Sequence, residues 1–224
     1  MDAYKTNLKN DDFCAVKKLL TENPDDLYKK EFIVEIVRCN AFKTLKMLVT
    51  EFGYQINQDL GVNIMQYFGG TNFTMLQFLV NNGLNLWFKI PNTDNVIVGD
   101  TMLYYACKVG NIKTVKYLIS CGISVNSVKG EAFDTACCNN HNDIVEFMID
   151  SGLDASYIDK GLYSAAYSKN ITMIKLLLQT GADVSKLGSF IDDGDVDKKE
   201  YQSLKILLDS GADFDDLLKI LCVY

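Results

Sequence analysis

The amino-acid sequence repeats one short pattern about every 30 residues. Each copy is an apolar run with the spacing i, i+3 and i+4, followed by two further residues and a glycine, as from Val115 to Gly122. The copies begin near residues 16, 45, 76, 115, 145, 174 and 204, at intervals of 29, 31, 39, 30, 29 and 30 residues. A period of this length is the signature of a repeat protein whose units stack on their neighbours.

The spacing within each copy places its apolar residues on one face of an α-helix. The glycine stands where the end of a helix needs a left-handed residue, a conformation that glycine adopts at little cost. Two copies are looser: the one at Leu45 has an extra residue before Gly53, and Asn23-Pro24 replaces the glycine after the one at Val16. We therefore expect each copy to be the second helix of a unit, with a first helix upstream.

The clearest first helix is expected over residues 100–111. It resembles the ankyrin pattern T-P-L-H-x-A-A-x-x-G-H, and the second helices resemble V-x-x-L-L-x-x-G-A-D; the matching first-helix residues are Thr101, Leu103, Ala106 and Gly110. The chain thus resembles the ankyrin-repeat family. This implies an all-α fold, a solenoid of stacked helix-turn-helix units with β-hairpin or loop fingers. It also implies one domain of about seven repeats over residues 1–224.

The sequence departs from the family pattern at several positions. No unit keeps the family's proline, and the first-helix histidine is replaced by Tyr104, Asp134 or Tyr163. Ile36 and Tyr67 occupy positions that the pattern fills with alanine, which leaves the helix spacing open in those units. The low proline content and the many Asn, Lys, Ile and Tyr residues are similar to ankyrin proteins of giant DNA viruses, of the mimivirus-like kind.

One interval is longer than the others and indicates an enlarged finger. The 39-residue interval adds about nine residues within 84–100. Two apolar runs there flank Pro91-Asn92-Thr93-Asp94-Asn95, which predicts a strand, a turn and a second strand. The segment contains the only tryptophan, Trp87, together with Phe88, Ile90, Val96 and Val98. A two-stranded finger cannot bury all of these side chains, so part of this surface is expected either to contact a partner or to pack on a neighbouring finger.

The resemblance implies that the chain binds another protein, because ankyrin partners commonly dock on the concave side formed by fingers and first helices. Its register gives these candidate partner-binding residues: Trp87, Phe88, Ile90, Asp100, Lys108, Val109, Lys129, Glu131, Cys138, Asn139, Tyr167 and Ser168. Two alternatives stay open. The chain could recruit substrates to a ubiquitin ligase, or it could be a structural protein that self-associates through its C-terminal end, where a short apolar helix is expected over 215–224.

The residue types give no support for an enzyme, a metal site or a bound cofactor. His141 is the only histidine and falls at the turn before a second helix, so a structural role is expected. Cys137 falls on a buried small-residue position, and Cys138 faces outward without a feature that would activate its thiol. The acidic cluster over 192–197 lacks the spacing of an EF-hand and reads as a solvated turn. Gly69-Gly70 lacks the surroundings of a phosphate-binding loop.

Charge and composition narrow the partner class further. The formal net charge is −7, and residues 182–224 carry 10 acidic and 5 basic side chains. An acidic chain without a basic patch is a poor ligand for nucleic acid or for an anionic membrane surface. The sequence has no apolar run of 18 residues and does not start like a secretory signal. Its seven cysteines form no regular framework, so reduced thiols and a cytoplasmic location are expected.

Overall fold

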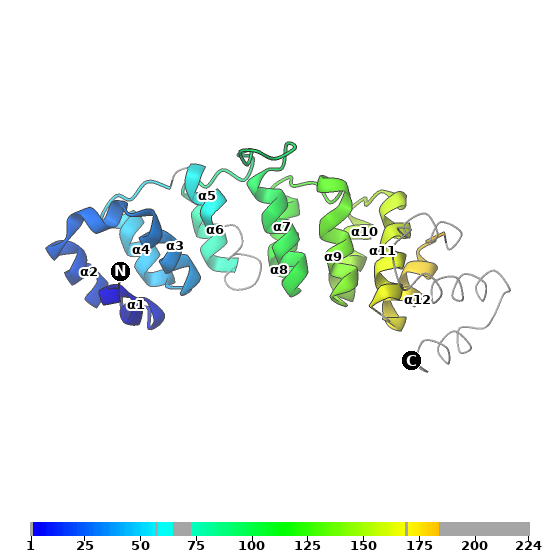
Figure 1. Ribbon diagram of the computed structural model, residues 1–224, viewed down its shortest axis with the longest axis horizontal. Helices are drawn as coiled ribbons and strands as arrows, with labels where there is room; N and C mark the ends of the chain where they lie inside the picture. Colours follow the sequence, from blue (N-terminus) through cyan, green and yellow to red (C-terminus); the bar gives the residue numbers. More distant parts are fainter. Residues whose placement is uncertain (1, 57, 65–72, 169, 184–224) are drawn as a thin grey trace. The chain divides into compact units, whose positions relative to one another are not determined.

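The computed structural model describes residues 2–56, 58–64, 73–168 and 170–183, which form helices joined by short connections (Figure 1). In chain order the elements are α1 (Asp2–Lys9), α2 (Phe13–Glu22), η1 (Pro24–Tyr28), α3 (Lys30–Arg38), α4 (Phe42–Thr50), α5 (Gln58–Ile64), α6 (Phe73–Asn81), α7 (Val98–Val109), α8 (Ile112–Ser120), η3 (Ser127–Gly130), α9 (Glu131–Cys138), α10 (Asn142–Asp150), α11 (Ala155–Tyr167) and α12 (Ile171–Gln179).

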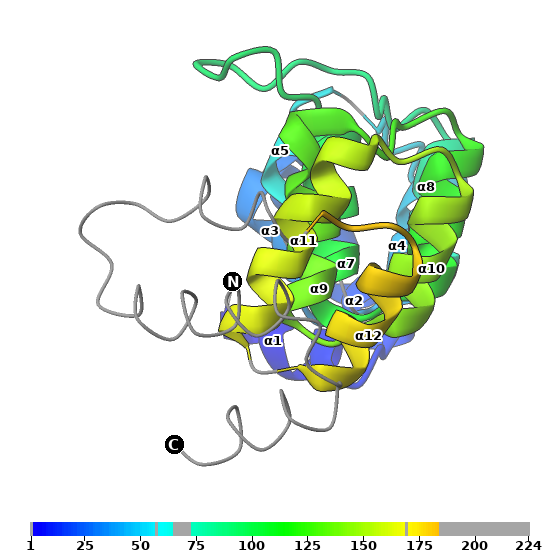
Figure 2. The same cartoon turned by 90° about the vertical axis from the view of Figure 1, so that its right-hand side faces the viewer.

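The chain divides into two compact units, residues 1–123 and residues 124–224. In unit 1, α3 packs on α4 and α7 packs on α8. In the described part of unit 2, α9 packs on α10 and α11 packs on α12, while the first helices α9 and α11 lie side by side (Figures 1 and 2). Each unit is therefore built from helix pairs that stack on one another.

The predicted second helices are formed at the expected places. Residues 16, 45, 76, 115, 145 and 174 lie in α2, α4, α6, α8, α10 and α12, and their apolar side chains are buried. The predicted start at residue 204 lies outside the described residues, as do Tyr67, Gly69-Gly70, the acidic cluster over 192–197 and the expected helix over 215–224. The closing glycine is left-handed as predicted, for example at Gly122 (φ 95°).

A tight turn joins the two helices of each pair. The backbone N–H of Asn111 donates to the carbonyl of Ala106 at 2.9 Å, and the N–H of His141 donates to the carbonyl of Ala136 at 3.1 Å. The residue before each of these donors is left-handed: Gly110 in the first turn and Asn140 (φ 65°) in the second. Asparagine tolerates this conformation better than most side chains, because its short polar group can bond to nearby backbone.

Small residues let the paired helices approach closely. Ala106, Cys107, Ala136 and Cys137 are all fully buried in the first helices, as their expected packing role requires. Ile36, the large residue at the same position of α3, is also fully buried, and α3 still packs on α4. The spacing of that unit is therefore compatible with a larger side chain.

A close helix contact in unit 2, at Gly161, gives a stability prediction. A Cβ atom on Gly161 of α11 would lie 2.6 Å from Cε1 of Phe133 and 2.9 Å from Sγ of Cys137. Alanine gains about 1 kcal/mol of helix propensity over glycine, but overpacking a core costs about 1–3 kcal/mol. We expect Gly161→Ala to lower the free energy of unfolding by about 1 kcal/mol in urea denaturation.

The neighbouring ring provides the control. Phe133→Leu removes the nearest clashing atom, Cε1, so adding it to Gly161→Ala should cost less than it costs in the wild-type background. Strictly additive effects, or a stabilised single Gly161→Ala variant, would contradict the close packing.

Candidate functional site

The finger, residues 84–100, reverses direction between α6 and α7 and projects beyond the helices (Figure 2). The N–H of Ile90 donates to the carbonyl of Val96 at 2.8 Å, and the N–H of Val98 donates to that of Phe88 at 3.0 Å. At the tip, the Thr93 hydroxyl donates to the carbonyl of Ile90 at 2.7 Å. The predicted reversal is formed, but its pairing amounts to one antiparallel bridge, Lys89 with Ile97, rather than two extended strands.

The inner end of the finger differs from the sequence expectation. Val98, expected on the second strand, is the first residue of α7 and is fully buried. The carboxylate of Asp100 accepts the backbone N–H of Ile97 at 3.1 Å, which satisfies a donor at the helix start and allows α7 to begin earlier than predicted. Asp100, a candidate contact residue, is therefore engaged in capping. Because Val98 is buried, less of the finger's apolar surface is exposed than expected. The exposed part is centred on Trp87, with Phe88 half-buried beside it.

Trp87 is both exposed and supported. Its side chain is 56% exposed, whereas the adjacent Leu86 is buried. The backbone N–H of Trp87 donates to the Asn85 side chain at 2.9 Å. A Cβ atom on Gly122 would lie 3.2 Å from Cζ2 of the indole, so one edge of the ring rests on the turn after α8. The sequence left open whether this side chain packs locally or is exposed. In the structure Trp87 does both: one edge packs on the turn and the rest is exposed.

The remaining finger residues are less exposed than Trp87. Phe88 and Ile90 are half-buried. Lys89 extends its ammonium to the Asn95 side chain at 3.0 Å, and so ties the two arms of the finger together. The finger thus presents one indole on a braced support.

The other candidate contact residues fall into separate groups. Lys108 and Val109 end α7, and Val109 is 51% exposed. Eight residues of helix separate Asp100 from Lys108, a rise of about 12 Å, so the finger and this pair lie toward opposite ends of α7. The structure does not gather the predicted residues of unit 1 into one patch.

In unit 2 the candidate contact residues also lie at opposite ends of a first helix. Lys129 and Glu131 are exposed at the start of α9, whereas Cys138 and Asn139 are exposed at its end. Ser168 follows α11 and donates its hydroxyl to the carbonyl of Ser164 at 2.8 Å. Tyr167 is the last residue of α11, and its side chain lies outside the described part of the structure.

The backbone around Lys129 is unusual. Val128 (φ 46°), Lys129 (φ 54°) and Gly130 (φ 73°) are three consecutive left-handed residues. For a β-branched residue such as Val128 this conformation is rare. The turn brings Gly130 against Tyr157, where an added Cβ would lie 2.6 Å from Cγ of the ring. Neighbouring repeats of unit 2 therefore meet closely at this turn.

A polar network joins the first helices of unit 2. The Ser164 hydroxyl of α11 donates to the Asp134 carboxylate of α9, and the Lys160 ammonium lies 3.5 Å from the same carboxylate. Beside them, partial burial raises the pKa of the exposed Cys138 thiol, the neighbouring Ser164 side chain lowers it, and the charge of Asp134 raises it. In the sequence, Asp134 stands out only because it replaces the family's first-helix histidine. Asp134 and Ser164 are separated by 30 residues, the length of one repeat, and this spacing was the signal that could have predicted their contact.

Tyr28 was not predicted from the sequence as a candidate, yet it is 79% exposed at the end of η1. It follows Asp25-Asp26-Leu27 in the short connection between α2 and α3. The available signal was an aromatic residue in a polar connection outside the helical pattern. Tyr28 is thus a second exposed aromatic side chain of unit 1.

The chemistry of the described residues suits contact more than reaction. His141 lies at the N-cap of α10, as its expected structural role requires. Burial raises the pKa of the Cys107 thiol to about 12. Within the described ranges, His, Cys, Asp and Glu side chains form no group of three that could hold a metal ion.

Alkylation should distinguish the thiols. Cys138 is exposed and Cys107 is buried, so iodoacetamide should modify Cys138 before Cys107 in the folded protein. The raised pKa of Cys138 leaves less thiolate at neutral pH than an ordinary cysteine has, and the thiolate is the nucleophile. We expect its rate, followed by peptide mass spectrometry, to rise through about pH 9. A rate that levels off near neutral pH would contradict this environment.

We expect the Asn126 side chain to stabilise the contact between two successive turns of unit 2. Its side-chain amide donates to the carbonyl of Gly152 at 3.1 Å and accepts the N–H of Asp154 at 2.8 Å. Asn126→Ala should lower the free energy of unfolding by about 1–2 kcal/mol and speed hydrogen exchange at the Asp154 amide. Asn126→Asp keeps the acceptor and should preserve more of the amide's protection. Unchanged exchange in Asn126→Ala would rule out this link.

Comparison with known proteins identifies the fold. The family model of ankyrin repeats in three copies matches residues 8–129. The human ASB11 ankyrin repeat domain superposes with a TM-score of 0.64 at 14% identity, covering 90% of this chain and 96% of that chain. At this identity the likeness shows the fold alone.

Relatives in large DNA viruses agree with the compositional resemblance. An ankyrin repeat protein of Acanthamoeba polyphaga mimivirus is 30% identical over 144 residues, covering 57% of this chain and 31% of the relative. A second mimivirus protein is 23% identical, covering 80% and 54%. One from Fowlpox virus (strain NVSL) is 26% identical, covering 60% and 34%. The chain thus spans between about a third and about half of the length of these curated relatives.

The family assignment also carries a general function, because ankyrin repeats mediate protein–protein interactions and are typically scaffolds without enzymatic activity. None of the helices in the described ranges is long and apolar enough to cross a membrane. The helix pairs, the closing glycines and the family match over more than half of the sequence agree, and the chain belongs to the ankyrin-repeat family.

Proposed function

We propose that this protein binds another protein through the Trp87 surface of its finger and through exposed residues at the ends of its first helices. The partner is an intracellular protein, and the site of action is the cytoplasm, that of the host if the chain is viral. The mimivirus and Fowlpox virus relatives support a viral setting. The cysteines of the described ranges form no disulfide bonds with one another, which suits a reducing compartment.

The exposure of Trp87 is the observation that carries this proposal. Tryptophan is enriched among residues that dominate the binding energy of protein interfaces, because it buries a large area with few rotatable bonds. Here 56% of the side chain is exposed while Leu86 and Val98, on either arm of the finger, are buried. The ring is consequently held out on an anchored segment, so that binding needs little further ordering.

The first-helix residues would supply further contacts, apart from those of the finger. In unit 1, Val109 adds exposed apolar surface and Lys108 a cation, while in unit 2 Cys138 and Asn139 add a thiol and an amide. We also propose that the repeat array continues to residue 224 with a seventh second helix near residue 204, since the 30-residue interval is kept there.

Replacing the indole tests the proposal. Trp87→Ala should weaken binding of the natural partner by about 2 kcal/mol or more if the ring is an anchor. Because the ring is mostly exposed, the free energy of unfolding should change by no more than about 1 kcal/mol. Calorimetric titration and urea denaturation measure the two effects separately.

Tyr28→Ala is the matched control, since it removes an exposed aromatic ring of the same unit. It should leave affinity unchanged if the partner reads the finger. A large fall in stability of Trp87→Ala with unchanged affinity would assign the ring to packing instead.

The partner itself can be found by affinity purification and mass spectrometry, comparing wild type with a Trp87→Ala plus Phe88→Ala variant. A protein captured by the wild type and lost with the variant is the expected result. Co-purification of cullin-type machinery would favour the ubiquitin-ligase adaptor. Concentration-dependent light scattering by the protein alone would favour self-association.

A further inference from the structure

A hollow of about 320 Å³ lies on the second helices of unit 1, away from the finger. It is lined by Phe13, Lys43, Lys46, Met47, Thr50 and Glu51, from α2 and from α4 and its end. Phe13 is 36% exposed, an unusual fraction for a large apolar side chain, and Met47 is buried. The hollow therefore has an apolar wall and floor, and its size falls in the range of about 300–1,000 Å³ that binds ligand groups.

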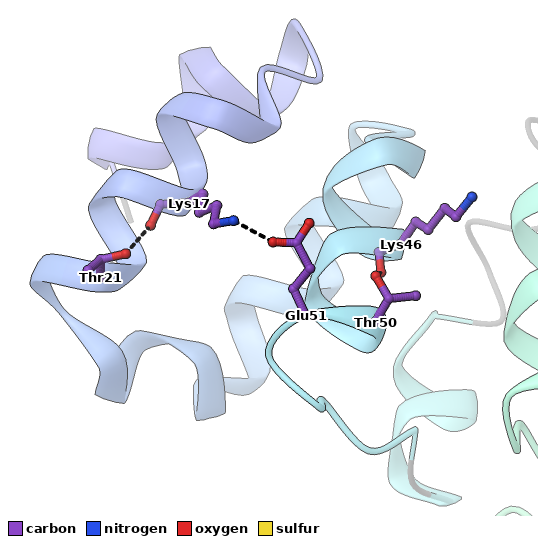
Figure 3. Close-up of polar contacts among 5 residues, drawn as sticks. All are labelled: Lys17, Thr21, Lys46, Thr50 and Glu51. Atoms are coloured by element: carbon purple, nitrogen blue, oxygen red, sulfur yellow. Dashed lines mark hydrogen bonds and ion pairs between the residues drawn. The ribbon is translucent and has the colours of Figure 1, made fainter.

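An ion pair closes one side of the hollow. The Lys17 ammonium of α2 lies 2.5 Å from the Glu51 carboxylate at the end of α4, and this contact joins neighbouring repeats (Figure 3). The pair uses the only carboxylate among the lining residues. The charge of Glu51 is thus largely balanced by Lys17 and is not available to neutralise other cations.

Two cations of the hollow remain unbalanced. Lys43 and Lys46 are exposed, and neither ammonium has a carboxylate partner within the described residues. In Figure 3 the Lys46 side chain extends away from the Lys17–Glu51 pair. Two other cations of this unit are paired: Lys29 with Asp26 and Arg38 with Glu35.

The carboxylates of Asp11 and Asp12, in the turn between α1 and α2, accept hydrogen bonds from backbone N–H groups. Asp11 accepts the N–H groups of Lys43 at 2.9 Å and of Thr44 at 3.0 Å, and also the Thr44 hydroxyl. Asp12 accepts the N–H of Ala15 at 3.1 Å. These carboxylates cap α4 and α2, and neither forms an ion pair with the Lys43 ammonium within the described residues.

We propose that this hollow docks a peptide segment of a partner protein in which one large apolar side chain is flanked by carboxylates. The apolar side chain contacts Phe13 and Met47, while the carboxylates pair with Lys43 and Lys46. Charge complementarity selects this occupant, because the hollow offers two free positive charges beside an apolar floor. An uncharged apolar segment leaves both ammonium groups unused, and a bare anion leaves the floor unused. The surface lies on α2 and α4, so it is separate from the finger that precedes α7.

A defined probe tests the proposal without knowledge of the partner. The probe is a fluorescent heptapeptide with a central phenylalanine between two pairs of aspartates, titrated against the full chain and followed by anisotropy. We expect saturable binding that weakens as salt is raised, since exposed charge pairs are screened. Two control peptides replace the phenylalanine by alanine or the aspartates by asparagines, and both should bind at least about fivefold more weakly.

Charge reversal locates the site. Lys43→Glu with Lys46→Glu should weaken the probe by about tenfold or more, because two attractions become repulsions. Lys18→Glu with Lys113→Glu is the matched control: it changes the net charge equally, at exposed positions of α2 and α8 that do not line the hollow. This control should bind the probe within about twofold of the wild type.

Several outcomes would overturn the proposal. Equal weakening by both double variants would mean that only overall charge matters. Equal binding of the phenylalanine and alanine peptides would show that the apolar floor of the hollow does not contribute to affinity. If light scattering showed dimers that Lys43→Glu with Lys46→Glu dissociates, the occupant would be a second copy of the chain rather than a partner peptide. Thermal unfolding of each variant, expected to match the wild type, shows that these losses do not come from misfolding.

Discussion

The close approach of two helices across small side chains is the constraint on which each repeat depends. In unit 2, α11 meets α9 where Gly161 leaves room for Phe133, and an added Cβ would lie within 2.6 Å of that ring. The tight turn at Asn140 and His141 returns the chain directly after α9, so α10 must pack on its own first helix. A helix pair this small cannot bury its apolar faces alone, and stacking on the next pair completes the core.

Stacking converts the sequence period into spatial neighbours. Asp134 and Ser164 are 30 residues apart, and their side chains bond between first helices. Asn126 reaches Asp154, 28 residues on, between successive turns. Such ties recur because residues one period apart occupy the same place in adjacent repeats. The finger breaks this rule, since its extra residues have no counterpart in the neighbouring repeats. That is why it can extend past them and keep Trp87 exposed.

Much of the fold could be predicted from the sequence, because the regular spacing of apolar residues indicates which side chains are buried. The apolar positions of the second helices and the left-handed glycines such as Gly122 were predictable from spacing alone. The start of α7 was not, because it depends on whether the Asp100 carboxylate bonds to Ile97. For the site, an apolar finger around Trp87 was predicted with its exposure left open, whereas Tyr28 and the hollow at Phe13 were not predicted. These features depend on contacts between side chains on different helices, which no single pattern contains. The wider set of partner-contact residues stays a prediction.

The distribution of charge gives the two proposed surfaces different roles. Residues 1–123 carry 13 basic and 12 acidic side chains, whereas residues 124–224 carry 9 and 17, so the acidity belongs almost wholly to the second unit. An acidic peptide therefore gains nothing from the overall field of the protein, because charges beyond about 10 Å are screened at ordinary salt. Its recognition must come from Lys43 and Lys46 within the hollow, together with an apolar anchor. The finger has no such local excess and depends on the area of an aromatic ring. A peptide segment that fits one of these proposed surfaces therefore need not fit the other.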